Sequence, residues 1–337
     1  MSNVGQGQPT TPLLLTDYPF DDADQERLRA ALGSGRFVQA TGRKAFRAAL
    51  KTHPDTEIIC TVHPPDDLLT LVPQLRWLAL ASAGAEHILR MELTRPEHGL
   101  IITTANGVHA VPISEFVFSA MLLWMRHWPR MLDDQRQTLW PRGAAYDALT
   151  GDELDGATLG VIGVGAIGRR VAQLAHAFGM RVVATRRSSA PQAPDPDVDQ
   201  WVSVDRLQDL LEQADVVAIC VPSTPQTHHL IDATRLHQMK RSALLINIAR
   251  GDAVDEDALI AALQDGTIAG AALDVFAHEP LPAESPLWKL PNVILSPHVS
   301  GMTNRYGKRL TDLLLDNLAR YRTGQPLRNV VDRARGY

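Results

Sequence analysis

Short apolar runs alternate with helical patterns along the first hundred residues. Runs that read as strands, each bounded by Pro, Gly or Asp, lie at 13–15, 57–62, 75–80 and 99–104. Between them, residues 24–32 and 44–50 carry helical periodicity. Strands that alternate with helices predict a parallel sheet covered on both faces.

The same alternation resumes more regularly after residue 157. Candidate strands lie at 158–163, 181–185, 215–220, 243–248, 270–275 and 292–296. Six strands with helices between them predict the doubly wound dinucleotide-binding fold. A last helix is expected at 306–321. Between the two regions, residues 113–130 predict a long helix that is apolar nearly all round, and therefore buried between domains or against another subunit.

Length and composition narrow the class of protein. A chain of 337 residues exceeds the usual size of a single core, so two domains are expected. A net charge of -5 leaves no electrostatic footprint for nucleic acid. The longest apolar stretch, near 116–125, is too short to span a membrane. Cys60 and Cys220 each lie in an apolar run, which indicates buried free thiols and a cytoplasmic protein.

A glycine-rich loop follows the strand TLGVI and precedes a helix. It reads Gly163-Val164-Gly165-Ala166-Ile167-Gly168. In such a loop the first glycine permits a tight turn, the second lets backbone N–H groups approach a pyrophosphate, and the third lets helix and strand pack closely. A strand–loop–helix context is what the motif requires, so we expect a bound dinucleotide.

The residues after the second strand of this region bear on the choice of dinucleotide. NAD enzymes usually carry Asp or Glu about 20 residues beyond the loop, to bind the ribose 2′-hydroxyl. Here the chain has Arg186, Arg187 and Ser188, which suit a 2′-phosphate. We therefore expect NADP(H) to be preferred, with NAD(H) possible. The alternative is two solvated arginines at a strand end.

Arg250, Glu279 and His298 each lie just after an apolar run. His298 would protonate a carbonyl oxygen as hydride arrives, or take the hydroxyl proton in reverse. Glu279 would hold the imidazole, and Arg250 would bind a substrate carboxylate. Taken singly, each has a structural alternative. His298 would be an ordinary histidine after a strand, Glu279 a turn residue before Pro280, and Arg250 a strand cap. Adjacent His228 and His229 do not face one site on a helix, so no metal site is expected.

These strings together resemble the D-isomer-specific 2-hydroxyacid dehydrogenase family. The resemblance rests on GVGAIG, DVVAICVPSTPQTHHLI, LLINIARGD, ALDVFAHEPLP and LPNVILSPHVSG. It implies an α/β fold of two doubly wound parallel-sheet domains, with a Rossmann nucleotide domain inserted into a flavodoxin-like substrate domain. The implied substrate domain comprises 1–108 and 297–337, and the nucleotide domain 109–296 with a dimerisation helix and arm. We therefore expect a homodimer.

The family also implies site residues. Arg250, Glu279 and His298 match its catalytic set, Ser82, Ala83, Gly84 and Arg250 its substrate-carboxylate site, and Asp274 its contact to the nicotinamide carboxamide. Further implied cofactor contacts, beside the glycine loop and 186–188, are Val221, Pro222, Thr224, Thr227, Ile248, Ala249, His298 and Ser300.

The expected reaction is NAD(P)-dependent reduction of a small 2-oxoacid to a D-2-hydroxyacid. The missing acid at position 186 and the string GVHAVPISEFV resemble the NADPH-using glyoxylate, hydroxypyruvate and 2-oxoacid reductases of the family. Formate dehydrogenases share the fold but carry Gln where this chain has the acid Glu279, which argues against that activity. Two alternatives stay open: a nucleotide-sensing corepressor-like binding protein, and a phosphite dehydrogenase-like oxidoreductase.

Overall fold

The computed structural model describes residues 12–186 and 195–333. The chain divides into two compact units. One, the split unit, comprises Met1–Val108 and Thr303–Tyr337, and the other, the inserted unit, comprises His109–Met302. The second junction therefore falls six residues later than the 296/297 boundary expected from the sequence.

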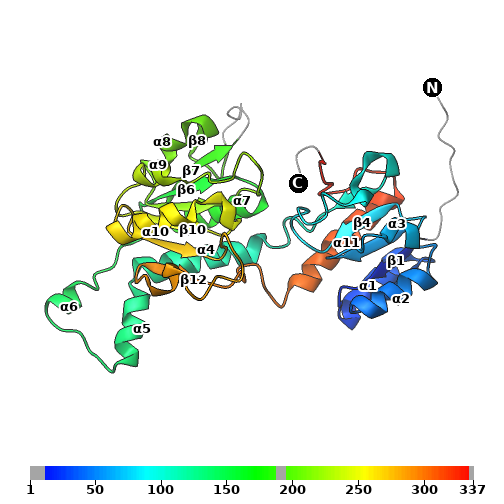
Figure 1. The fold of residues 1–337 in the computed structure, drawn as a ribbon, viewed down its shortest axis with the longest axis horizontal. Coiled ribbons are helices and arrows are strands. Elements are labelled where there is room, and N and C mark those ends of the chain that lie inside the picture. Colours follow the sequence, from blue (N-terminus) through cyan, green and yellow to red (C-terminus); the bar gives the residue numbers. More distant parts are fainter. Residues whose placement is uncertain (1–11, 187–194, 334–337) are drawn as a thin grey trace. The chain divides into compact units, whose positions relative to one another are not determined.

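Within the described residues, the split unit is built on a five-stranded sheet (Figure 1). Its elements are β1 (Leu13–Thr16), α1 (Asp22–Leu32), β2 (Arg36–Gln39), α2 (Arg43–Thr52), β3 (Ile58–Thr61), α3 (Leu68–Leu71), β4 (Trp77–Leu80), β5 (Ile101–Thr103) and α11 (Tyr306–Arg322). The strands pair in parallel in the order β2-β1-β3-β4-β5. This is the flavodoxin-like order.

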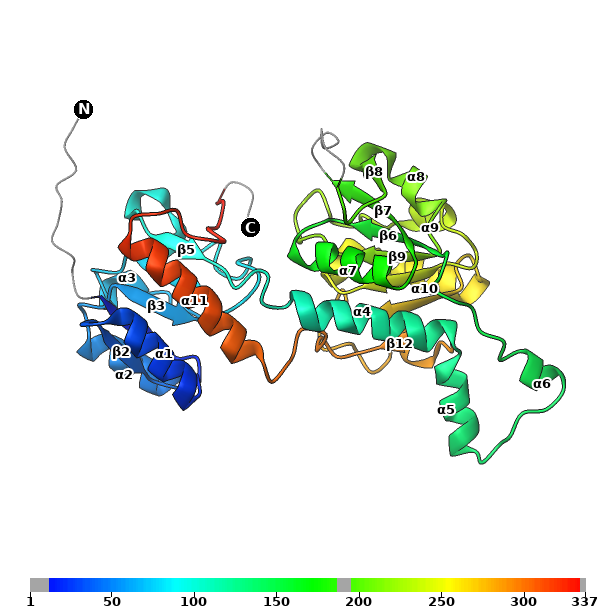
Figure 2. The same cartoon turned by 180° about the vertical axis from the view of Figure 1, so that it is seen from behind.

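The apolar runs of this unit bury side chains on both faces of the sheet. Leu14 and Ile58 pack in one cluster with α1 and α11, whereas Leu15 and Ile59 pack in another with α2 and α3. Successive side chains of a strand point to opposite faces, so a run that is apolar at every position is covered twice. Helix α11 follows the inserted unit in sequence and returns to lie beside α1 (Figure 2).

The inserted unit holds a second sheet, of seven strands in the described ranges. Its elements are α4 (Ala110–Met125), α5 (Trp128–Arg136), α6 (Ala144–Asp147), β6 (Thr158–Ile162), α7 (Ala166–Ala177), β7 (Arg181–Arg186), β8 (Gln200–Ser203), α8 (Leu207–Leu211), β9 (Val216–Ile219), α9 (Ala233–His237), β10 (Leu244–Asn247), α10 (Glu256–Asp265), β11 (Gly270–Leu273) and β12 (Val293–Leu295). The strands pair in parallel in the order β12-β11-β10-β9-β6-β7-β8. Strands β7 and β8 are added on one side of β6, and strands β9 to β12 on the other, so the strand order reverses between β6 and β9, as in the Rossmann fold.

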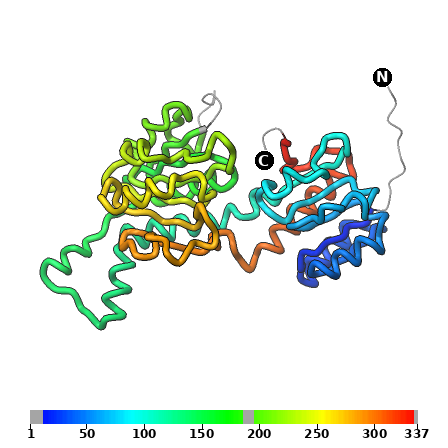
Figure 3. Tube along the Cα trace, viewed as in Figure 1, coloured from blue at the N-terminus to red at the C-terminus, as the bar shows by residue number. Residues whose placement is uncertain are grey.

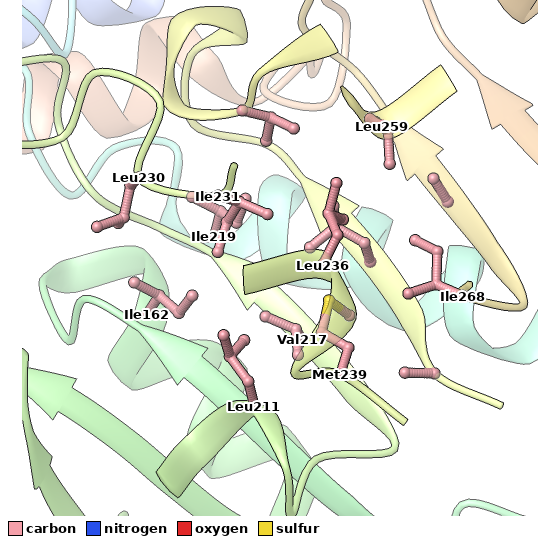
Figure 4. Packing of buried hydrophobic residues seen from close by; sticks show 14 of the residues in the cluster. Ile162, Leu211, Val217, Ile219, Leu230, Ile231, Leu236, Met239, Leu259 and Ile268 are labelled. Carbon is pink, nitrogen blue, oxygen red and sulfur yellow. The ribbon is translucent and has the colours of Figure 1, made fainter. Parts of the chain in front are cut away.

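Two apolar clusters sandwich this sheet. On one face, Val217 and Ile219 pack with residues of α8, α9 and α10, among them Leu211, Leu236 and Leu259 (Figure 4). On the other, Val216 and Ala218 pack with residues of α4 and α7. The fold class expected from the sequence, two doubly wound parallel α/β domains with a Rossmann sheet, is confirmed.

Three local expectations were wrong. Strands β2 and β8 were missed because both lie at sheet edges, where RFVQ and QWVS are only partly buried and carry no apolar run. The long helix expected at 113–130 ends at Met125, and α5 begins at Trp128. His127 between them adopts a left-handed φ of 52°, which breaks the helix.

Helices α5 and α6, with the loop between them, form an arm that extends from the inserted unit (Figure 3). Large apolar side chains are exposed along it, at Trp128, Leu132, Leu139, Trp140 and Tyr146. In the described part of the chain, none of the helices combines the length and apolar character needed to cross a membrane.

Candidate active site

The sequence-predicted residues of the inserted unit gather at the carboxyl ends of its strands. The carboxyl ends of parallel strands share one edge of a sheet, and ligands of doubly wound folds bind there. The glycine loop follows β6, Arg250 follows β10, Asp274 follows β11 and His298 follows β12. Because β6, β9, β10, β11 and β12 are consecutive neighbours in the sheet, these loops follow one another along its carboxyl end, with the loop after β9 between the glycine loop and Arg250.

The glycine loop has the geometry of an anion cradle. Gly163 has a φ of 95°, a left-handed value that favours glycine. A Cβ on Gly168 would lie 2.1 Å from the Gly163 carbonyl oxygen, so only glycine lets the start of α7 pack so closely. A Cβ on Gly165 would have no described atom within 4 Å, which leaves open space at the helix N-terminus. No described side chain accepts a hydrogen bond from the N-terminus of α7. The N–H groups of its first turn, from Ala166 to Gly168, could therefore donate to a pyrophosphate.

The loop after β9 lies against the glycine loop. A Cβ on Gly163 would meet Val221 Cγ1 at 2.8 Å. Thr227 Oγ1 donates to the Pro222 carbonyl at 2.7 Å and accepts from Thr224 N at 2.8 Å, so this hydroxyl closes the loop on itself. The loop thus forms a fixed wall beside the cradle.

The residues expected to read the 2′-position are only partly described. Arg186 ends β7, where its backbone pairs with that of Ser203. Arg187 and Ser188 lie outside the described residues. The cofactor preference inferred from these three residues stays a prediction.

A buried asparagine shapes the turn that presents Arg250. Asn247 Nδ2 donates to the Arg250 carbonyl at 2.9 Å, and Asn247 Oδ1 accepts from Ala249 N at 3.1 Å. Ile248 and Ala249, both expected near the cofactor, are buried within this turn. The Arg250 guanidinium donates to the Ala249 carbonyl at 2.7 Å. Asn247 therefore fixes the backbone from which Arg250 projects.

Gly251 brings the Arg250 turn against the loop that carries Glu279. A Cβ on Gly251 would lie 1.9 Å from both the carbonyl carbon and oxygen of Phe276. Side chains other than hydrogen do not fit there. The close backbone approach explains why glycine follows Arg250 and why the two loops keep a fixed spacing.

Glu279 and His298 form a direct pair. His298 Nδ1 lies 2.7 Å from Glu279 Oε2, and Glu279 Oε1 accepts from Phe276 N at 3.1 Å. The His298 side chain is 50% exposed, so the imidazole is held on one side and open on the other. Because an ionised carboxylate only accepts hydrogen bonds, Nδ1 carries the proton in this pair, and Nε2 lies outside it.

Asp274 is fully buried and binds the segment Ser296–Gly301, here called the acid loop. Asp274 Oδ1 accepts from Ser296 Oγ at 2.6 Å and from Val299 N at 2.8 Å. Asp274 Oδ2 accepts from Ser300 N at 3.0 Å. The expected contact of Asp274 with the nicotinamide stays a prediction, and the structure gives this carboxylate protein partners on both oxygens.

In the split unit, the expected substrate-carboxylate loop follows β4. Ser82 Oγ donates to the Gly84 carbonyl at 2.9 Å, and Ala105 N donates to the Ser82 carbonyl at 2.8 Å. Tyr306 OH donates to the Ala81 carbonyl at 2.8 Å. Burial raises the pKa of the Tyr306 phenol, so it remains a donor. The loop is thus braced from within its own unit.

Several supporting residues were not predicted from the sequence. Asn247 and Ser296 lie inside the quoted motifs, as polar residues next to apolar strands, and this was the available signal. His109 was not among the expected site residues, yet its Nδ1 lies 3.1 Å from the Gly301 carbonyl oxygen. Because His109 lies far from the acid loop in sequence, no sequence pattern indicated this contact.

His228 and His229, the adjacent histidines of the sequence, stack with ring centroids 4.0 Å apart.

Comparisons with known proteins identify a family. The family model described as "D-isomer specific 2-hydroxyacid dehydrogenase, NAD binding domain" matches residues 118–300. A glyoxylate reductase of Korarchaeum cryptofilum is 34% identical over 266 residues, 79% of each chain. An (S)-sulfolactate dehydrogenase of Chromohalobacter salexigens is 38% identical over 261 residues, 75% of this chain and 80% of its own.

Solved structures share the fold over nearly the whole chain. The D-isomer specific 2-hydroxyacid dehydrogenase from Xanthobacter autotrophicus, solved with NADPH and MES, is 27% identical and has a TM-score of 0.80. The alignment covers 97% of this chain and 99% of that one. Since the family model spans more than half of the 337 residues and relatives above 30% identity cover three quarters of them, the chain belongs to the D-isomer-specific 2-hydroxyacid dehydrogenase family of nicotinamide-dependent oxidoreductases.

Proposed function

We propose that this protein reduces a small 2-oxoacid to the D-2-hydroxyacid with NADPH, with His298 as the general acid. The observation that carries the proposal is the pair between His298 Nδ1 and Glu279 Oε2 at 2.7 Å. It joins two of the three predicted catalytic residues and leaves the imidazole half exposed beside the predicted cofactor site.

The pair supports proton transfer at one atom, Nε2 of His298. With Nδ1–H donated to Glu279, a protonated His298 offers its second proton at Nε2. That N–H would donate to the carbonyl oxygen of the 2-oxoacid and transfer its proton as the alkoxide forms. In the reverse reaction the neutral Nε2 would accept the hydroxyl proton. Glu279 would hold the imidazole ring in place through this contact.

Arg250 would bind the substrate carboxylate. A guanidinium presents N–H donors in a planar fork that matches a carboxylate. Its turn is fixed by Asn247 and pressed by Gly251 against the Glu279 loop. Ser82, Ala83 and Gly84 of the split unit would add backbone N–H donors for the same carboxylate.

The cofactor would lie along the carboxyl edge of the inserted unit. Bound there, NADPH supplies the hydride that is added to the substrate carbonyl carbon. The glycine loop and the N-terminus of α7 would hold the pyrophosphate. Arg186, Arg187 and Ser188 would bind the 2′-phosphate, and this sequence supports NADP(H) over NAD(H). The NADPH bound to the Xanthobacter relative is in line with this choice.

The arm supports a homodimer. Trp140 is 80% exposed, and Trp128, Leu139 and Tyr146 add apolar surface to the same segment. Large apolar side chains exposed along one segment are typical of an interface. Light scattering after size exclusion should give twice the chain mass, and Trp128→Glu combined with Trp140→Glu should give the monomer.

A cytoplasmic location is part of the same proposal. Both cysteines of the chain, Cys60 and Cys220, are free thiols. Free thiols persist in reducing compartments. Fractionation of the source cells with markers for each compartment tests this.

The deciding experiment is a panel of initial rates with purified protein. Glyoxylate, hydroxypyruvate, pyruvate, phenylpyruvate and 3-sulfopyruvate would be offered with NADPH and with NADH, and phosphite with NADP⁺ and NAD⁺. We expect turnover of at least one 2-oxoacid, a D-configured product, and a loss of roughly two to four decades in kcat for His298→Ala. Nucleotide binding without turnover would favour the corepressor-like alternative, and phosphite oxidation would favour the phosphite dehydrogenase-like one.

A further inference from the structure

The acid loop holds its histidine in an uncommon backbone conformation. His298 has a φ of 54°, in the left-handed region that residues other than glycine rarely adopt. His298 N donates to the Ser296 carbonyl at 3.1 Å, so the turn is tight. Such a conformation persists only where surrounding contacts fix it. The Glu279 contact fixes the ring, and other contacts have to fix the backbone.

Asp274 supplies most of those contacts. Its carboxylate binds the hydroxyl of Ser296, two residues before His298, and the backbone N–H groups of Val299 and Ser300, directly after it. The hydrogen bonds therefore bracket His298 on both sides. Asp274 itself is anchored to the sheet, because its N–H donates to the Asn247 carbonyl at 3.0 Å. A buried carboxylate needs such donors, and all three come from the acid loop.

His109 holds the far end of the same loop. It precedes α4, and its Nδ1 lies 3.1 Å from the Gly301 carbonyl oxygen. A carbonyl oxygen only accepts, so Nδ1 of His109 is the donor. A Cβ on Gly301 would come within 2.8 Å of that same nitrogen, so glycine permits the approach.

We propose that Asp274 and His109 are positioning residues that hold the acid loop so that the imidazole of His298 meets Glu279 and the substrate. This inference rests on the proposed function of His298. It gives Asp274 a role separate from the cofactor contact implied by the family, and it gives His109 a role of its own. Both residues act through His298 and touch no reacting atom.

The kinetic test is a double-mutant cycle. Asp274→Asn keeps the shape of the side chain but replaces one acceptor oxygen by an amide that cannot accept. We expect kcat to fall by about 10- to 100-fold, since a displacement near 1 Å can cost about 100-fold, while the Kd for NADPH changes less than about threefold. In a His298→Ala background the same substitution should change kcat by less than about twofold, because its effect passes through His298. Ser296→Ala, which removes one donor to Asp274, should give the same pattern more weakly.

His109 offers a rescue test. His109→Leu removes the donor to Gly301 and should lower kcat several-fold, with little change in the KM for NADPH. His109→Gln keeps an N–H donor and should restore most of the loss. Asp215→Asn is the matched control, since Asp215 also bridges chain segments through Thr158 N and Lys240 Nζ, but at the amino end of the strands. It should leave kcat unchanged.

A readout without turnover separates this proposal from the proposed function. In protein labelled with ¹⁵N-histidine, the Nδ1–H resonance of His298, bound to Glu279, should be resolved in the wild type and in Asp215→Asn. It should be shifted or lost in Asp274→Asn, Ser296→Ala and His109→Leu. If the wild type turns over none of the 2-oxoacids but the resonance behaves in this way, the proposed function fails and the positioning role stands.

Other results would overturn the positioning role. A rise in the NADPH Kd with kcat intact would make Asp274 a cofactor contact alone. Additive losses in the His298→Ala background would mean that Asp274 acts elsewhere. If Asp274→Asn does not fold, Ser296→Ala and the two His109 variants decide. A His298 resonance that is unchanged in both Ser296→Ala and His109→Leu refutes the proposal.

Discussion

Substitution by alanine should have different effects at two glycines of the glycine loop. Gly165 is the N-cap of α7, and Gly168 lies in the first turn of that helix. A methyl group on Gly165 would point into open space, whereas one on Gly168 would overlap backbone. Gly165→Ala should therefore weaken cofactor binding in a stable protein, and Gly168→Ala should weaken the fold itself.

For Gly165 the folding cost is small. Its φ of -86° and ψ of -158° are extended backbone that any residue adopts. Alanine is a poorer N-cap than glycine, but it also reduces the entropy of the unfolded chain, so the net change in unfolding free energy should stay within about 1 kcal/mol. With the pyrophosphate bound at this loop as proposed, the methyl group would take the space of a phosphate oxygen. Loss of one charge-assisted hydrogen bond, about 1.5–3 kcal/mol, corresponds to about 10- to 150-fold in the Kd for NADPH.

For Gly168 the overlap is severe. The added Cβ would lie 2.1 Å from the Gly163 carbonyl oxygen and 3.1 Å from Val161 Cγ1. Neither the carbonyl nor the packed Val161 side chain can withdraw without moving α7 from β6. Overpacking of this kind costs about 1–3 kcal/mol, and the contact with backbone places Gly168→Ala at or above the upper end.

Thermal unfolding of the apoproteins and NADPH titrations followed by tryptophan fluorescence separate the two effects. Each variant serves as the control for the other. Wild-type affinity for NADPH in Gly165→Ala would show that no phosphate occupies the open space. Wild-type stability in Gly168→Ala would show that the close approach of α7 to β6 is not needed.

Four other substitutions or reagents test separate parts of the molecule. Arg250→Lys keeps the charge but loses the planar fork, so we expect a higher KM for the 2-oxoacid and a lower kcat together; a change in thermal stability alone would make Arg250 structural. Wild-type protein should prefer NADPH over NADH by about one to three decades in kcat/KM, and Arg186→Asp should erase or reverse this, because a carboxylate repels the 2′-phosphate; unchanged preference would contradict the assignment. Cys60 is fully buried, and burial raises the pKa of its thiol to about 12, so a disulfide reagent at pH 8 should label Cys60 only after unfolding. Burial also raises the pKa of Asp17 above 3.8, although a hydrogen bond from Thr61 opposes it. The folded state therefore loses stability as pH rises from 3.8 through the raised pKa of Asp17. Asp17→Asn should raise the melting temperature at pH 7 but not at pH 3. Equal shifts at both pH values would rule out the ionised carboxylate as the cause.

The layers of the fold were predictable because its strands are buried on both faces. Runs such as 215–220 and 243–248 are apolar at nearly every position, which is the pattern of a central parallel strand. The edge strands β2 and β8 lack this pattern, since an edge strand is partly exposed and needs no apolar run. The break at His127 depends on one left-handed residue, and histidine gives no strong signal for that conformation.

The motifs predicted which residues lie at the carboxyl edge but not how they are held. The apolar run before SPHVSG predicted that His298 follows a strand, and the structure adds that Glu279 contacts its Nδ1. The contact between His109 and Gly301 joins residues 192 positions apart in sequence. Patterns within one segment carry no information on such a pairing, because it arises only after the chain has folded.

The burial of Asp274 connects stability with catalysis in this site. A carboxylate without exposure is costly unless donors surround it, and here the donors belong to the acid loop. If the loop moved, it would leave the Asp274 carboxylate without those partners, so the desolvation cost of Asp274 resists displacement of His298. The same hydrogen bonds that satisfy a buried charge thereby keep a strained histidine in place. A conservative change at Asp274 should for this reason disturb the position of His298 before it disturbs the fold.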